Sequence, residues 1–333
     1  MIKKFLKDHP VHKKISPKLD AIFLLRPTMF FSVWVMVVVG IISAKINMNA
    51  PSLWNTEFSS EIFLVFLGLT LLISAAFITM QIAEAKNDPV NKKLLLIGQH
   101  ISADKSTKIA KILLISGCII SIFTNWMTGI PAVCIYFLWG IGYNKSILLS
   151  ETIPSASWLV NSCVGALLFI IGWILGMENY FHNGIIPLSF DTCSYMFPYL
   201  LCFSAISLLT TLQDMDGDDS GEGIIPTVFE HATSLVIALL MVGIAVYFSF
   251  KLADPLASTA TLVSIPFFII SAIRRLHKDI LRAIRYPIFI FNFFSLTYYP
   301  WLVVPLLCTY YLSKYYYWHR FDLHYPTFLV DND

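Results

Sequence analysis

The chain of 333 residues is 57% hydrophobic and only 13% charged, with a formal net charge of +2. Its mean hydropathy of +0.70 and its 26 Phe, 15 Tyr and 8 Trp residues exclude a soluble domain and predict an all-α, polytopic protein embedded in membrane lipid. We expect no nucleic-acid partner. The six cysteines lie almost all in apolar segments without a C-x-x-C pair, which argues against a disulfide framework or a zinc site. The long Lys-rich lead lacks a cleavage pattern, so we do not expect a signal peptide.

Nine transmembrane helices are expected after a basic segment at residues 1–25, which we expect to lie along the membrane surface. Their expected ranges are 27–45, 62–82, 107–125, 128–143, 155–177, 193–213, 227–250, 256–273 and 287–311. The turn after Asn125 is very short, so eight or ten helices are the alternatives. The chain is thus expected to have an N-terminal segment at 1–25, a nine-helix domain at 26–313 and a C-terminal tail at 314–333.

Lysine and arginine residues are distributed unevenly over the connections between these helices. With the N-terminus in the cytoplasm, 19 of them fall on the cytoplasmic side, and only Lys45, Lys251, Lys314 and Arg320 fall on the other. Cytoplasmic loops carry an excess of Lys and Arg, so we expect a cytoplasmic N-terminus. An odd number of helices then places the C-terminus on the opposite side.

The stretch from Thr211 to Pro226 is strongly acidic and contains no Lys or Arg; its acidic residues are Asp214, Asp216, Asp218, Asp219 and Glu222. Asp214 and Asp218, the second acidic pair, are four residues apart and share a face if the preceding apolar helix continues through them. Mg²⁺ is commonly held by one or two carboxylates together with substrate phosphates. The stretch therefore predicts half of a metal–diphosphate site.

Glu84 and Asp88, the first acidic pair, have the same spacing at the end of the second expected helix, on the same side of the membrane. Lys92 and Lys93 follow them and are suited to bind diphosphate oxygens as point charges. Ionisable residues near the membrane core are expensive to bury and are therefore functional candidates. We expect the two acidic pairs to bind Mg²⁺ in one site.

With these pairs the chain resembles the UbiA superfamily of intramembrane prenyltransferases over nearly its whole length. That superfamily has nine transmembrane helices, with an N-x-x-x-D-x-x-x-D motif ending the second and a D-x-x-x-D-x-x-x-D motif ending the sixth. The matching residues here are Met80, Glu84 and Asp88 for the first motif, Asp214 to Asp218 for the second, Arg26-Pro27 at the first helix, and Tyr143 to Pro154, which is similar to a Y-S-x-x-P-L stretch of the superfamily.

Several positions depart from the superfamily pattern. Met80 replaces its Asn, Glu84 its first Asp, Thr211 stands at the first position of the second motif, and Glu151 replaces a Lys. Met80 has no oxygen to offer a metal, but each motif retains two carboxylates, which suffice for one Mg²⁺ each. The departures are consistent with a divergent branch.

The resemblance implies nine helices around a central apolar cavity with a cytoplasmic cap. It also implies Mg²⁺-dependent ionisation of an isoprenyl diphosphate and transfer of the prenyl group to a lipophilic acceptor. Metal binding is assigned to Glu84, Asp88, Asp214 and Asp218, with Asp216, Asp219 and Glu222 as substitutes if the register differs locally. The assigned catalytic residues are Lys92, Lys93, Lys145 and Arg26, which would stabilise the leaving diphosphate, and Tyr143.

Two alternatives remain open at this point. The first is an intramembrane terpene cyclase, in which a double bond of the substrate captures the cation without an acceptor. The second is a non-enzymatic membrane protein or transporter with acidic loops. A haem-modifying enzyme is not favoured, because no histidine lies in the middle of an expected helix.

Overall fold

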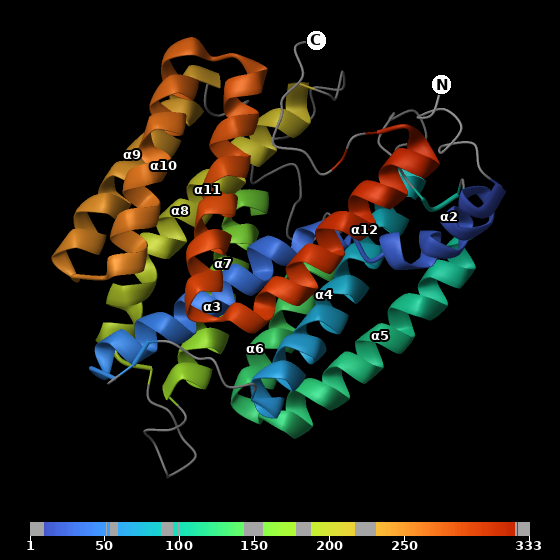
Figure 1. Ribbon diagram of the computed structural model, residues 1–333, viewed down its shortest axis with the longest axis horizontal. Coiled ribbons are helices and arrows are strands. Elements are labelled where there is room, and N and C mark those ends of the chain that lie inside the picture. The colour runs from blue at the N-terminus through green and yellow to red at the C-terminus, as the bar shows by residue number, and fades with distance from the viewer. Residues whose placement is uncertain are drawn as a thin grey trace.

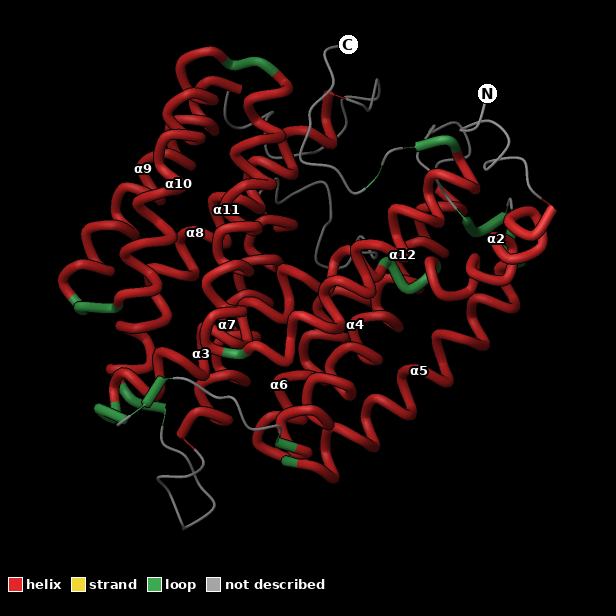
Figure 2. Tube along the Cα trace, in the orientation of Figure 1, coloured by secondary structure: helices red, strands yellow, loops and turns green. Residues whose placement is uncertain are grey.

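The computed structural model describes residues 10–50, 52–53, 59–87, 96–98, 100–142, 156–177, 188–216, 231–323 and 325. Within these ranges the protein is helical (Figures 1 and 2), and the one β-bridge joins Ile97 to Ile101 in a turn. The prediction of an all-α protein is confirmed.

Several of the described helices begin at a capping side chain. Asn125 accepts hydrogen bonds from the backbone N–H groups of Met127 and Thr128, and Asp254 accepts those of Leu256 and Ala257, as expected of N-cap residues. The elements are α2 (Pro10–Phe23), η1 (Pro27–Met29), α3 (Phe30–Asn47), α4 (Ser60–Asn87), α5 (Ala103–Thr124), α6 (Trp126–Tyr136), the π-helical turn η2 (Phe137–Gly142), α7 (Ala156–Met177), α8 (Phe190–Asp216), α9 (His231–Lys251), α10 (Pro255–Arg274), α11 (His277–Tyr298), η5 (Pro300–Leu302) and α12 (Val303–Phe321).

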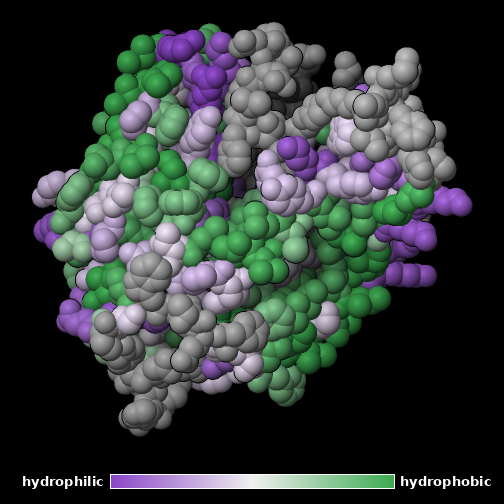
Figure 3. Space-filling model, in the orientation of Figure 1, coloured by the Kyte–Doolittle hydropathy of each residue, from purple (hydrophilic) through white to green (hydrophobic). Residues whose placement is uncertain are grey.

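Eight described helices are long and apolar enough to cross a membrane: α3 with η1, α4, α5, α7, α8, α9, α10 and α11. The segment Trp126–Gly142, formed by α6 and η2, is apolar but shorter. The expected count of nine transmembrane helices is therefore not confirmed. Figure 3 shows apolar residues in green over much of the visible surface, with hydrophilic residues in purple near the α10–α11 turn and at the edge beside α2.

The expected helix at 287–311 is wrong. The described chain turns at Tyr299 and Pro300, so this range contains the second half of α11, η5 and the first half of α12. The sequence remains apolar and aromatic through the turn, which hid the break. Helix α12 then runs back to α2, where Tyr316 and Arg320 both bond the carboxylate of Asp20. The described ends of the chain consequently meet at one end of the bundle (Figure 1), which contradicts the expectation of opposite sides.

The last turns of α4 and α8 lie at this same end, which we call the α2 end. On α4, Gln81 donates a hydrogen bond to the Leu24 carbonyl beyond α2, at 2.9 Å. Helix α3 begins beside α2 and ends at the far end, where Ser43 contacts Asp254. Tyr199, early in α8, also bonds Asp254, so α8 starts at the far end and returns to the α2 end.

Candidate functional site

The structure places one member of each acidic pair on a described helix. Glu84 lies on the last turn of α4 and Asp214 on the last turn of α8, and both turns are at the α2 end. Their side chains, and Asp88 and Asp218 altogether, lie outside the described residues. Among the side chains that are described, no group of three or more His, Cys, Asp or Glu could hold a metal.

Arg26 is the assigned catalytic residue that the structure describes. It has a left-handed backbone conformation with φ of 52° at the corner between α2 and α3, a conformation that is uncommon for a residue other than glycine. Burial raises the pKa of Tyr317 to about 12, and the neighbouring Arg26 guanidinium opposes that rise. Arg26 therefore lies at the α2 end, close to the last turn of α12.

The other assigned residues fall outside the described part of the chain. These are Lys92, Lys93, Tyr143 and Lys145, together with the substitute ligands Asp219 and Glu222, while Asp216 is described only as the last residue of α8.

The departures from the superfamily pattern are visible on α4 and α8. Met80 is buried. A spacing of four residues before Asp214 falls on Thr210 rather than Thr211, and both hydroxyls donate to backbone carbonyls one turn earlier, at 2.9 and 3.0 Å. These positions therefore contribute packing and helix hydrogen bonds where the superfamily motifs carry Asn and Asp.

A partly open apolar cavity lies below the α2 end, between α3, α8 and α11. Its lining is almost wholly hydrophobic and comprises Ser32, Val35, Met36, Val39, Tyr199, Cys202, Phe203, Ile206, Ile288 and Phe291. Ile206 lies eight residues before Asp214 on α8, which corresponds to about 12 Å along the helix. The cavity is therefore apolar and lies about two helical turns from the position of Asp214 on α8.

A polar chain connects η2, α7 and α8 in the same layer of the bundle. Trp139 donates to Asn161 at 2.8 Å, and Asn161 donates to the Ser207 hydroxyl at 3.0 Å. Trp139 also stacks on Phe77 of α4, with ring centroids 5.4 Å apart. These hydrogen bonds hold the π-helical turn η2, which directly precedes Tyr143 in the sequence. Such turns are frequent at functional sites.

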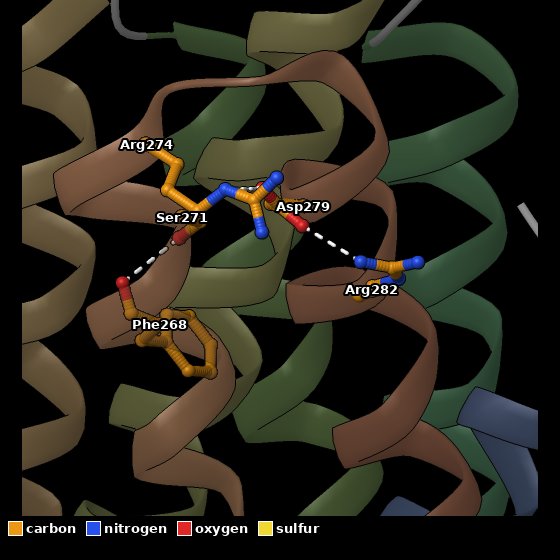
Figure 4. A network of polar contacts seen from close by, with 5 residues as sticks. All are labelled: Phe268, Ser271, Arg274, Asp279 and Arg282. Carbon is orange, nitrogen blue, oxygen red and sulfur yellow. Dashed lines mark hydrogen bonds and ion pairs between the residues drawn. The ribbon is translucent and has the colours of Figure 1, made fainter. Parts of the chain in front are cut away.

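The turn between α10 and α11 carries a cationic cluster around one buried carboxylate (Figure 4). Asp279 is 1% exposed and lies 3.2 Å from Arg274 Nε and 2.9 Å from an Arg282 guanidinium nitrogen. Below it, the Ser271 hydroxyl donates to the Phe268 carbonyl at 2.9 Å. Because two arginines flank one aspartate, this turn keeps a net positive charge while its helices are fixed to each other.

The chain matches one family of membrane enzymes. The model of the UbiA prenyltransferase family matches residues 33–296. The chain therefore belongs to the UbiA prenyltransferase family, whose members transfer prenyl groups. No curated protein sequence matches the chain significantly. Both α2 and α12 lie outside the matched range.

Three solved structures illustrate the shared fold. A digeranylgeranylglyceryl phosphate synthase is 17% identical with a TM-score of 0.58, covering 86% of this chain and 97% of its own. A UbiA homologue from Archaeoglobus fulgidus bound to GPP and Mg²⁺ is 13% identical with a TM-score of 0.60, and the match covers 83% of this chain and 99% of the homologue. A UbiA homologue from Aeropyrum pernix is 16% identical with a TM-score of 0.56, and the match covers 83% of this chain and 97% of the homologue.

Sequence reasoning did not find the residues that shape the cavity or its polar surroundings. Asn161 and Asp254 did carry a signal, because an amide and a carboxylate stand out in or beside apolar helices. The cavity lining carried none, since its aliphatic and aromatic residues are indistinguishable in sequence from ordinary packing.

Proposed function

We propose that this protein ionises an allylic isoprenyl diphosphate with the help of Mg²⁺ and transfers the prenyl group to a lipophilic acceptor within the membrane. The observation that supports this most strongly is the apolar cavity below the two helix ends that bear Glu84 and Asp214. Archaeoglobus homologues of the same fold were solved with GPP and Mg²⁺ and with DMAPP and Mg²⁺.

The metal ligands in this proposal are Glu84, Asp88, Asp214 and Asp218. A pair of carboxylate oxygens from each helix end offers the hard ligands that Mg²⁺ prefers, with phosphate and water completing its shell. Bound Mg²⁺ supplies charge neutralisation of the diphosphate as it leaves. The cavity is too apolar to hold that charge, so the diphosphate belongs at the α2 end and the hydrocarbon below it.

Cationic residues near the helix ends have a separate task. Lys92, Lys93, Lys145 and Arg26 are proposed to hold diphosphate oxygens, so that the negative charge developing as the bond breaks is already compensated. Arg26 is fixed by its corner between α2 and α3, whereas the lysines lie outside the described residues. Tyr143, which follows the π-helical turn, is proposed to face the reacting carbon.

The acceptor is proposed to be apolar or neutral, because the cavity presents almost no polar surface and no cation for a carboxylate. The α2 end is proposed to face the cytoplasm, because the connections expected on that side carry the excess of Lys and Arg. Mass spectrometry of lipids from cells with and without the protein identifies the acceptor as the species that gains an isoprenyl mass.

Diphosphate release tests this function. The full-length protein in vesicles of native lipid extract, which supply acceptor, should release diphosphate from prenyl diphosphates only with Mg²⁺. Glu84→Ala and Asp218→Ala should each lower the rate at least about 100-fold, as expected when a charge-stabilising group is lost. Asp104→Ala, on the exposed first turn of α5, is the matched control and should stay near the wild-type rate. Full activity in both site variants would show that Glu84 and Asp218 are not the Mg²⁺ ligands.

The motif departures favour one second candidate, a terpene cyclase. Met80 and Thr210 stand where the superfamily motifs carry Asn and Asp. A changed site favours a reaction other than the usual transfer to an acceptor. Turnover in pure detergent without any lipid acceptor, with a cyclic hydrocarbon or alcohol as product, would identify the cyclase. A requirement for added lipid identifies the transferase.

A further inference from the structure

We propose that Tyr199, held by Asp254, closes the far end of the cavity and sets the longest isoprenyl chain that this protein accepts. This inference rests on the proposed function, because it assigns the cavity to the hydrocarbon part of the substrate. It concerns the end of the cavity away from the acidic pairs.

Tyr199 is the cavity-lining residue of α8 that lies furthest from the acidic end. The lining residues of α8 follow one stripe at intervals of three to four residues, from Ile206 through Phe203 and Cys202 to Tyr199. From Asp214 to Tyr199 the helix advances fifteen positions, or about 22 Å. A chain that starts at the α2 end and follows this stripe therefore meets the Tyr199 ring last.

The ring of Tyr199 cannot turn aside easily, because it is 1% exposed and is packed by aromatic residues of two other helices. Its centroid lies 5.8 Å from that of Phe169 on α7 and 5.9 Å from that of Phe291 on α11. Phe291 is itself part of the cavity lining. The two rings thus form the floor from opposite helices.

The hydroxyl of Tyr199 is fixed as well. It donates to Asp254 Oδ2 at 2.9 Å, while Asp254 Oδ1 accepts the backbone N–H groups of Leu256 and Ala257 at 3.0 Å each. Asp254 is 0% exposed, so a rotated tyrosine would leave its buried Oδ2 with only the longer hydrogen bond from the Ser43 hydroxyl, at 3.5 Å. Leaving such a group unsatisfied is costly, and this cost keeps the ring across the cavity.

A test can use binding, so that no acceptor needs to be known. The probes are prenyl thiolodiphosphates, in which sulfur replaces the bridging oxygen and slows cleavage, with two to five isoprene units and Mg²⁺. For the wild type, affinity should rise with length until the chain reaches the floor, and then fall. Tyr199→Ala should bind the first disfavoured analogue about tenfold more tightly than the wild type, because overpacking against the ring is relieved.

Two further variants separate a floor from a general packing role. Tyr199→Phe keeps the ring and should keep the wild-type length limit, even if the protein unfolds at a lower temperature. Phe197→Ala removes a ring from the other side of α8, where Phe197 is 39% exposed and packs on Phe248, and should not move the limit.

The outcomes distinguish this inference from the function on which it rests. If the wild type binds no analogue with Mg²⁺, both the proposed function and the floor are wrong. If the wild type shows a length limit that a folded Tyr199→Ala protein retains, the floor is wrong and the proposed function stands. A limit that moves equally in Phe197→Ala also overturns the role of Tyr199.

Discussion

Helix α3 packs in close contact with α7 on one face and borders an open cavity on the other. On the packed face, a Cβ atom added to Gly172 would overlap the Val37 carbonyl oxygen, and one added to Gly40 would overlap that of Phe169. On the cavity face, Val35, Met36 and Val39 border empty volume. The same helix therefore has a close backbone contact on one face and a cavity on another.

This difference reflects the physics of helix association in lipid. Lipid is as apolar as leucine, so helices associate through close packing of small residues rather than through hydrophobic burial. The backbone contact of α3 with α7 can keep α3 in place while its other face stays unfilled. A cavity is thereby preserved without the collapse that would otherwise follow from the attraction between its apolar walls.

The largest expected effect comes from breaking the packed face. Gly172→Ala should destabilise the folded protein by about 3 kcal/mol or more, because α3 and α7 must move apart. The thermal unfolding midpoint of the purified protein, followed by tryptophan fluorescence, measures this loss.

Gly243→Ala on α9 is the matched control for that substitution. In the described part of the chain, no atom beyond its own stretch of helix lies within 4 Å of the Cβ that it would add, so it should be neutral or stabilise by up to about 1 kcal/mol. Equal unfolding midpoints for the two variants would show that the α3–α7 contact is not a tight one.

Filling the cavity face should affect substrate binding and leave folding intact. Met36→Trp should weaken binding of prenyl thiolodiphosphates by at least about tenfold, because added volume takes the space of the hydrocarbon. Its unfolding midpoint should remain within a few degrees of the wild type. Ile112→Trp on the outer side of α5, at a residue that is 66% exposed, should change neither property. A Met36→Trp protein that binds normally would place the hydrocarbon elsewhere.

The smallest expected effect concerns the polar chain beside the cavity. Asn161→Ala removes the partner of both Trp139 and Ser207, and hydrogen bonds between helices in membranes contribute on average about 0.6 kcal/mol each. We expect a drop of a few degrees in the unfolding midpoint and a modest loss of turnover in the diphosphate-release assay. A complete loss of activity at an unchanged midpoint would indicate a direct role of Asn161 in the reaction.

Sequence patterns were sufficient for the helical class, for most helix positions and for the two acidic helix ends. Hydropathy succeeds there because each helix must satisfy its own backbone groups in lipid. The pattern failed at 287–311, because Tyr299 and Pro300 interrupt a run that stays apolar on both sides. It also could not show that Met36 and Tyr199 border a void, since a void depends on how three separate helices diverge.

Cross-linking tests most directly the claim that the cavity face of α3 holds the hydrocarbon of an isoprenyl diphosphate. A prenyl diphosphate analogue with a photoreactive group at its hydrocarbon end is irradiated with the full-length protein, and the labelled peptides are identified by mass spectrometry. The account predicts Mg²⁺-dependent labelling within residues 32–39 and 199–206, which decreases in Glu84→Ala. Labelling confined to the outer face of α5, or labelling that is independent of Mg²⁺ and of the acidic pairs, would contradict it.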